Sequence, residues 1–326
     1  MRLAPQVQEL LNAPAESLDH LTVSEQRQRI RELSDMNYHR YGRSPESACV
    51  SADHRVPVDD GAEITVRAYR PSAQAPLPAH VELHGGGWWL GSIDEHVNEA
   101  ICRYRCVHAH CVVFAVEYRL APEHPFPAAV NDVYATLTWI ASHATELGID
   151  PGRLSVGGTS AGANLAAAAT ILARDCAGPR LVFQLLEVPA LDLTGETMRA
   201  ALATEELAPL ARHIGEFETP LRHYFRDSAD ALRPLASPVF ADDLSGLPPA
   251  EVMTAEYDPL RDEGERYAER LAQAGVPVTV TRHAGAIHGT SFLTRVWPPA
   301  QNWQRDAAAA IRRSHERASG VGRLPW

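Results

Sequence analysis

The chain has 326 residues, of which 45% are hydrophobic and 22% are charged, so it has the composition of a globular protein that can bury a sizeable core. Its 41 acidic and 30 basic side chains give a net charge of −11, and the basic ones are all arginine. An acidic chain without a basic stripe argues against nucleic acid or an anionic membrane surface as a partner.

Two features bear on the compartment in which the protein works. The N-terminus lacks the apolar core of a signal peptide, and no apolar run reaches the roughly eighteen residues of a membrane-spanning helix. The five cysteines are odd in number and irregularly spaced, so they do not indicate a disulfide framework. We therefore expect a cytoplasmic protein in a reducing environment.

The first elements along the chain are a polar helical segment and a β-hairpin. Residues 1–50 are expected to form a separate helical cap segment, in which a helix begins near Ser24 and carries Ile30 at the start of an apolar stripe. The dipeptide Asp60-Gly61 between two apolar runs is a hairpin signal. The flanking strands are expected at Arg55–Val58 and Ile64–Tyr69.

From residue 80 onward short apolar runs alternate with helical segments, which predicts a mostly parallel sheet covered by helices on both faces. Strands are expected at His80–Leu83, Cys111–Tyr118, Leu154–Gly157, Leu181–Leu186, Glu251–Ala255 and Val278–Arg282. Helices are expected at Glu95–Ala109 and near Ala129–Glu146, Ala163–Arg174, Asp262–Gln273 and Gln301–Arg317.

The polar stretch 195–230 interrupts this alternation within the main domain, 51–326. We expect it to be an inserted cap segment that lies over the strand ends. In open α/β sheets ligands bind at the carboxyl ends of the strands, so such an insertion would cover the ligand site.

The most informative motif is Gly158-Thr159-Ser160-Ala161-Gly162. It follows a predicted strand and opens an alanine-rich helix, which is the context of a nucleophile elbow. The turn would expose the hydroxyl of Ser160. The N–H of Ala161 would lie at a helix N-terminus, where negative charge is stabilised.

A second motif, His84-Gly85-Gly86-Gly87-Trp88, follows the strand predicted to end at Leu83. Three consecutive glycines suit either a flexible turn or a loop whose bare N–H groups approach a reacting oxygen. In the second interpretation Gly86 and Gly87 form an oxyanion hole with Ala161.

These motifs identify a resemblance to the bacterial hormone-sensitive-lipase-like esterases of the α/β-hydrolase fold. The resemblance covers roughly residues 50–320 and is carried by four segments, His84–Trp88, Glu117–Glu123, Gly158–Gly162 with Asn164, and Asp258–Asp262. It implies that Ser160 is the nucleophile, Asp258 the acid and His288 the base. Their order along the chain is that of α/β-hydrolases.

Other side chains compete for two of these roles. His283 ends a predicted strand and is the main rival for the base, whereas His288 is expected in a loop with Gly285 and Gly289, where it can reach the serine. For the acid, Glu256 is an alternative. Asp262 is better explained as the start of a helical capping box with Glu265.

Several further residues admit a structural interpretation. The tract Glu117–Pro127 is expected to be structural, and Trp88 and Trp89 are expected either to line a substrate pocket or to pack. The cluster Cys102, Cys106, His108, His110 and Cys111 fits no standard zinc spacing, because its side chains would diverge between a helix and a strand. No metal site is therefore expected.

Three positions depart from the family pattern. Thr159 stands where the family usually has aspartate, Ala163 where it usually has glycine, and Val188, beside Glu187, where it often has tyrosine. None is a member of the triad, so these changes bear on the polarity of the pocket and on the substrate range.

The sequence thus predicts a serine carboxylesterase that hydrolyses short- to medium-chain acyl esters without a metal or an organic cofactor. An acyltransferase, deacetylase or amidase with the same triad, acting on a secondary metabolite, is an alternative. A hydrolase homologue that only binds a ligand is less favoured, because all three triad residues are present. The expected partner is a small-molecule ester, and a homodimer is left open.

Overall fold

An eight-stranded sheet runs through the part of the chain that the computed structural model describes, residues 3–12, 16–73, 76–210 and 218–320. The strand order is β1-β2-β4-β3-β5-β6-β7-β8, and only β2 runs against the other strands. The predicted mostly parallel sheet is therefore confirmed. The strands span β1 Cys49–Pro57, β2 Glu63–Pro71, β3 Leu77–Leu83, β4 Val112–Val116, β5 Ile149–Thr159, β6 Phe183–Glu187, β7 Ala250–Tyr257 and β8 Val278–Ile287.

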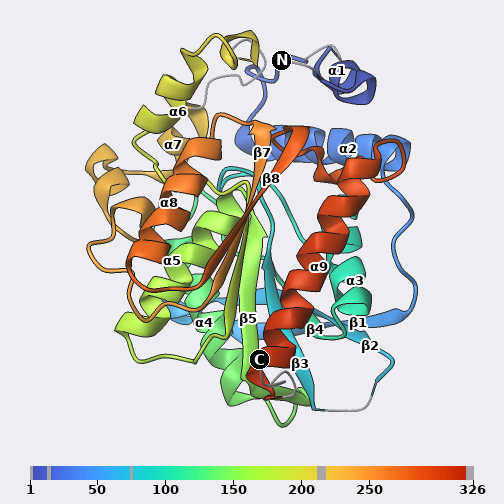
Figure 1. Cartoon of the computed structure of the whole chain (residues 1–326), viewed down its shortest axis with the longest axis vertical. Coiled ribbons are helices and arrows are strands. Elements are labelled where there is room, and N and C mark those ends of the chain that lie inside the picture. The colour runs from blue at the N-terminus through green and yellow to red at the C-terminus, as the bar shows by residue number, and fades with distance from the viewer. Residues whose placement is uncertain (1–2, 13–15, 74–75, 211–217, 321–326) are drawn as a thin grey trace, which may run out of the picture.

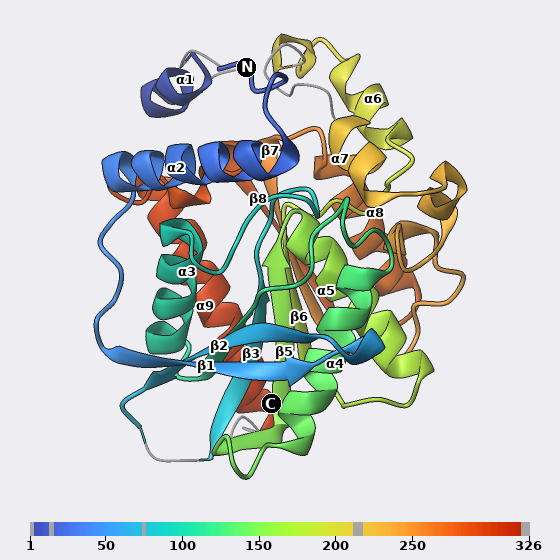
Figure 2. The ribbon, with the colours of Figure 1, turned by 180° about the vertical axis from the view of Figure 1, so that it is seen from behind.

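Helices cover both faces of this sheet (Figures 1 and 2). Every residue of β3, β4 and β6 is buried, as continuous apolar strands require when both faces are covered. α3 and α9 pack on one face, and α4, α5 and α8 on the other. These helices span α3 His96–His108, α4 Ala128–Ser142, α5 Ala161–Asp175, α8 Arg261–Gln273 and α9 Pro298–Ala318.

The predicted hairpin is formed by β1 and β2, which run across the front of the view in Figure 2. Its turn, Asp59–Gly61, requires left-handed backbone conformations, with φ of 67° at Asp60 and 79° at Gly61. Asparagine, aspartate and glycine tolerate this region best, which is why the dipeptide marked the turn correctly.

Four further helices lie above the carboxyl ends of the parallel strands, so the fold carries a helical cap (Figure 1). α2 begins with a capping box, in which the backbone N–H of Glu25 donates to Thr22 and the Glu25 carboxylate accepts from the backbone N–H of Thr22. Part of the expected insertion, residues 211–217, lies outside the described residues. The cap helices span α1 Pro5–Leu11, α2 Val23–Tyr41, α6 Glu196–Leu202 and α7 Glu218–Tyr224.

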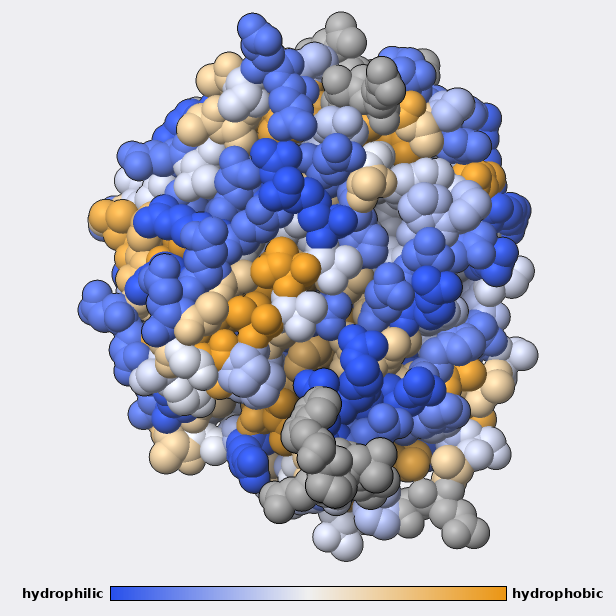
Figure 3. All heavy atoms as spheres, viewed as in Figure 1, coloured by the Kyte–Doolittle hydropathy of each residue, from blue (hydrophilic) through white to orange (hydrophobic). Residues whose placement is uncertain are grey.

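The last strand, β8, is longer than predicted and forms one edge of the sheet. It continues to Ile287, and Gly285 lies inside it with φ of 71° rather than in the expected loop. Figure 3 shows an apolar patch over this strand, where Val280 is 45% exposed. Within the described ranges, none of the helices has the length and apolar character needed to cross a membrane.

Candidate active site

The nucleophile elbow joins β5 to α5 at Ser160. Ser160 has φ 58° and ψ −117°, and its backbone N–H donates to the carbonyl oxygen of Glu187 at 2.8 Å. A Cβ added at Gly162 would overlap the carbonyl oxygen of Leu83, and one at Gly158 would overlap it too. The two glycines are therefore required by the close approach of the elbow to the end of β3.

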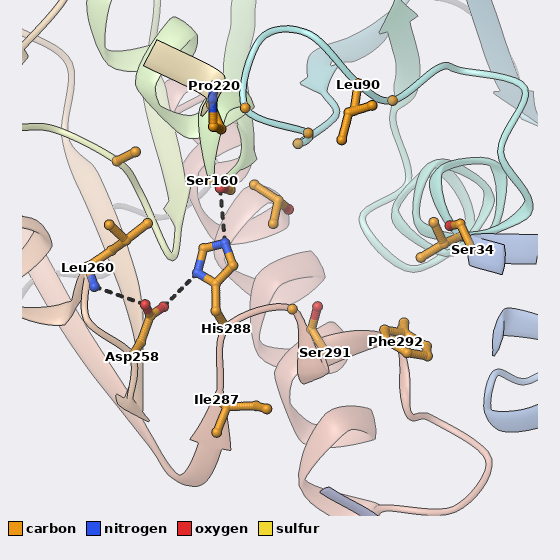
Figure 4. Close-up of a pocket in the computed structure, with 18 of the residues that line it drawn as sticks. Ser34, Leu90, Ser160, Pro220, Asp258, Leu260, Ile287, His288, Ser291 and Phe292 are labelled. Carbon is orange, nitrogen blue, oxygen red and sulfur yellow. Dashed lines mark hydrogen bonds and ion pairs between the residues drawn. The ribbon is translucent and has the colours of Figure 1, made fainter. Parts of the chain in front are cut away.

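Three side chains from different strand ends meet in one chain of hydrogen bonds (Figure 4). The distance from His288 Nε2 to Ser160 Oγ is 3.0 Å, and that from His288 Nδ1 to Asp258 Oδ2 is 2.8 Å. Asp258, which is 1% exposed, follows β7, and its second oxygen accepts the N–H of Leu260 at 2.9 Å. Hydrogen bonds thus fix the carboxylate at both oxygens, and the carboxylate orients the imidazole.

The electrostatics of His288 suit a general base that gains a proton during the reaction. Burial alone would lower its pKa, but the charge of Asp258 and its hydrogen bond outweigh this effect, so the pKa of His288 lies above the ordinary value. The imidazole side chain is 38% exposed, which leaves it accessible from the cavity.

The rival residues occupy other environments. His283 stacks on Trp303 at 4.0 Å between ring centroids, and the Glu256 carboxylate accepts the N–H of Gly285 at 2.6 Å. The predicted capping box at Asp262 is wrong, because α8 has Leu260 at its N-cap and Asp262 already lies in the first turn. Instead of closing a box, Asp262 pairs with the neighbouring Arg261.

The glycine loop lies beside the elbow and has backbone conformations that residues with a Cβ rarely adopt. Gly86 has φ 118° and Gly87 has φ 59°. A Cβ on Gly86 would overlap the carbonyl oxygen of Leu90, and one on Gly87 would lie 3.0 Å from Pro220 of the cap. Ala161 is the first residue of α5, so its N–H has no acceptor within the helix. Gly86 and Gly87 line the same cavity as Ser160, and Ala161 directly follows Ser160 in the chain.

A single arginine of the cap holds the far end of this glycine loop. Arg27 of α2 donates to the carbonyl oxygen of Trp89 at 2.7 Å and to that of Ala121 at 2.6 Å. It also forms an ion pair with Glu123 at 2.7 Å. The tract 117–127, predicted to be structural, thus supplies two of the partners. The sequence did not reveal Arg27, because these partners lie 62 to 96 residues away along the chain.

A cavity of about 570 Å³ opens at Ser160 and is lined by both the sheet and the cap. Trp88 lines it, stacks on Tyr224 at 4.7 Å and donates to Asn164 at 3.3 Å, so it both packs and faces the cavity. Trp89 is not among the described lining residues, and its ring lies at a tilt against His223, 4.8 Å between centroids. Most of the wall is apolar, including Leu11, Ile30, Leu90, Val97, Ile101, Met198, Leu210, Ile287 and Phe292.

A buried ionic network lies behind the elbow. Arg105 of α3 is fully buried and bridges the carboxylates of Glu82 and Glu187. Glu187 also accepts the indole N–H of Trp303 from α9 at 2.6 Å. Since the backbone carbonyl of Glu187 accepts the N–H of Ser160, this network connects Ser160 to α3 and α9. Nothing in the local pattern around Glu187 predicted it.

The positions that depart from the family pattern do not disturb the triad. Thr159 lines the cavity, and Ala163 is fully buried in α5. Val188 is 3% exposed and has φ 41°, an uncommon conformation for a β-branched residue.

The cysteine-rich segment has no metal-binding geometry in the described ranges, where no group of three potential ligands could hold a metal ion. Cys102 and Cys106 of α3, and Cys111 just before β4, are all buried in the core. Burial raises the pKa of Cys111 to about 12, so its thiol keeps its proton at neutral pH.

Comparison with known proteins now settles the family. The sequence pattern of the family described as alpha/beta hydrolase fold matches residues 80–292. This chain belongs to that family. It is similar to "Carboxylic ester hydrolase LipN" of Mycobacterium tuberculosis, with 46% identity over 70% of this chain and 61% of LipN. "Carboxylesterase NlhH" of the same species is 40% identical over 80% of this chain and 82% of its own length.

A solved structure supports the same assignment within the family. A hyperthermophilic esterase from the archaeon Pyrobaculum calidifontis superposes with a TM-score of 0.86 at 38% identity, over 96% of this chain and 99% of that chain. The predicted hormone-sensitive-lipase-like esterase family and the α/β-hydrolase fold are thus confirmed.

Proposed function

We propose that the protein is a serine carboxylesterase in which Ser160 is the nucleophile, His288 the base and Asp258 the acid. The carboxylic-ester hydrolase activity follows from the family and its carboxylesterase relatives. The observation that carries the residue assignment is the hydrogen-bonded chain from Ser160 through His288 to Asp258, at 3.0 Å and 2.8 Å.

The reaction proceeds in two halves that use the same groups. His288 takes the proton of Ser160 as its hydroxyl attacks the ester carbonyl, and the oxyanion forms against the N–H groups of Gly86, Gly87 and Ala161. His288 then protonates the leaving alcohol, which leaves an acyl-enzyme. Water, activated by the same imidazole, attacks the acyl carbon and releases the acid.

The cavity supports the proposed substrate range. Its volume of about 570 Å³ lies within the range of small-molecule sites, and its largely apolar wall suits short to medium acyl chains. We propose that residues 1–50 and 195–230 act as the cap that encloses these chains. Transfer of the acyl group to an alcohol or amine instead of water would show as product partition when a competing alcohol is added.

Homodimer formation and a cytoplasmic location remain predictions.

The test is hydrolysis of a chromogenic short-chain ester by the purified protein. Ser160→Ala should lower kcat by several orders of magnitude, about 10⁶-fold in a comparable serine enzyme. His288→Ala should be similarly damaging, whereas the matched variant His283→Ala should retain turnover. A Ser160→Ala protein with unchanged hydrolysis would place the nucleophile elsewhere, and a His283→Ala protein worse than His288→Ala would reassign the base.

A further inference from the structure

One corner of the substrate cavity is polar, in contrast to the rest of its wall. It is formed by Ser34 of α2 and by Glu95 and Asn98 at the start of α3. Figure 4 shows Ser34 on the side of the cavity away from Asp258. A group bound in this corner would therefore lie apart from the catalytic carboxylate, at the far end of a substrate held at Ser160.

One oxygen of the Glu95 carboxylate is available to accept a hydrogen bond from a ligand. The side chain is only 8% exposed, and Ser34 Oγ donates to its Oε2 at 2.9 Å. Within the described residues this is its sole hydrogen bond, and no cation forms an ion pair with it. Its neighbour Asp94, by contrast, is paired with Arg67 at 2.9 Å. Burying a carboxylate without a cationic partner is costly, so a ligand that supplied one would be bound favourably.

The charges around this corner have the sign that favours a cation. Burial raises the pKa of Glu95, and the negative charges of Asp35 and Glu117 raise it further, against the hydrogen bond from Ser34 and the charge of Arg31. Arg31 is 43% exposed and lies 3.7 Å from Asp94, so solvent screens most of its effect. Among the described residues that line the cavity, none is an arginine.

We propose that Glu95 is a specificity residue that receives a protonated amine carried by the ester substrate. The ammonium N–H donates to the free carboxylate oxygen, while Ser34 holds the other oxygen in place. This inference rests on the proposed function, because it assigns the far end of a substrate whose ester carbonyl lies at Ser160. The amine is not consumed, so it contributes binding and orientation, and the triad performs the chemistry.

The test compares esters that differ only in charge. In 2-(dimethylamino)ethyl butyrate the alcohol half carries an amine that is protonated near neutral pH, and 3-methylbutyl butyrate is its uncharged isostere. Ethyl 4-(dimethylamino)butyrate and ethyl 5-methylhexanoate form the same pair for the acyl half. The measured quantity is the charge preference, defined as kcat/KM for the amine divided by kcat/KM for its isostere.

The wild-type protein should show a charge preference above one in at least one pair. Glu95→Gln, which keeps the shape and can still accept from Ser34, should lower that preference at least tenfold and leave the uncharged ester within about threefold of wild type. Glu99→Gln is the matched control on the same helix, because Glu99 pairs with Arg103 at 2.7 Å, and it should leave the preference unchanged.

Two results would overturn the proposal: a wild-type preference below one in both pairs, or a preference that Glu95→Gln leaves intact. The first result is measured on the wild-type protein, so the proposal can be tested even if Glu95→Gln folds poorly. These results are distinct from failure of the proposed function, which would appear as hydrolysis of the uncharged esters by Ser160→Ala.

Discussion

Arg27 of the cap helix α2 contacts the glycine loop, and Arg27→Ala tests whether this contact supports the proposed oxyanion hole. Its guanidinium donates to the carbonyl oxygens of Trp89 and Ala121, which flank the loop in space. We predict that the variant folds but holds Gly86 and Gly87 less firmly. Because their N–H groups act on charge that develops only in the transition state, the loss should fall on kcat rather than on KM.

The magnitude follows from the contacts that are removed. Each carbonyl that loses its charged donor costs about 1 to 1.5 kcal/mol, since water reaches a site where the Arg27 side chain is 24% exposed. The ion pair with Glu123 adds little, because the Glu123 side chain is 52% exposed. The sum of about 2 to 3 kcal/mol corresponds to a fall in kcat of about 30- to 160-fold.

The assay is steady-state hydrolysis of the same chromogenic ester, together with inhibition by a boronic acid that forms a tetrahedral adduct on serine. Both kcat and the affinity for the boronic acid should fall in Arg27→Ala. Arg29→Ala, on the same helix but paired with Glu16 at 2.8 Å, should change neither, and Glu123→Gln should stay within about threefold. A kcat for Arg27→Ala within twofold of wild type would refute the reasoning.

Three further variants probe the scaffold. Asp258→Asn should lower kcat about 10⁴-fold, and it removes the charge that raises the pKa of His288. Because the imidazole must be neutral to act as a base, activity falls as pH drops through this pKa, so the acid limb of the pH–rate profile should move to lower pH. Gly162→Ala should lose about 2–3 kcal/mol of unfolding free energy in urea, since its Cβ would overlap the Leu83 carbonyl. Arg105→Met should lower the unfolding free energy by about 3–5 kcal/mol in the same assay, because it leaves two buried glutamates without a cationic partner. A loss below about 1 kcal/mol would contradict a buried network.

The sequence predicted the features whose cause is local. The elbow at Ser160 and the hairpin turn at Asp60 are recognisable because glycine or a turn residue is required at a fixed offset within a few positions. The alternation of apolar runs and helices likewise predicted the sheet and its covering helices, since a strand buried on both faces must be continuously apolar.

Features that depend on contacts across the chain were not predicted. Arg27 and Glu95 look like ordinary surface charges in sequence, and only the packing of α2 against the loop and of α3 against the cavity gives them roles. The capping box at Asp262 failed for a related reason. The turn in which Asp258 Oδ1 accepts the N–H of Leu260 starts α8 with Leu260 at its N-cap, so Asp262 falls inside the helix.

The attachment of α2 to the glycine loop limits how freely this enzyme's lid can be exchanged. A chimera could take its N-terminal helices from a relative that prefers other substrates. Its cavity would then be lined by different side chains at positions such as Ile30 and Ser34. Unless the graft also presented a guanidinium at position 27, the transplanted helices would lie over a glycine loop that has lost the Arg27 contact. A change of substrate selectivity through α2 therefore has to keep the arginine at position 27 if turnover is to be preserved.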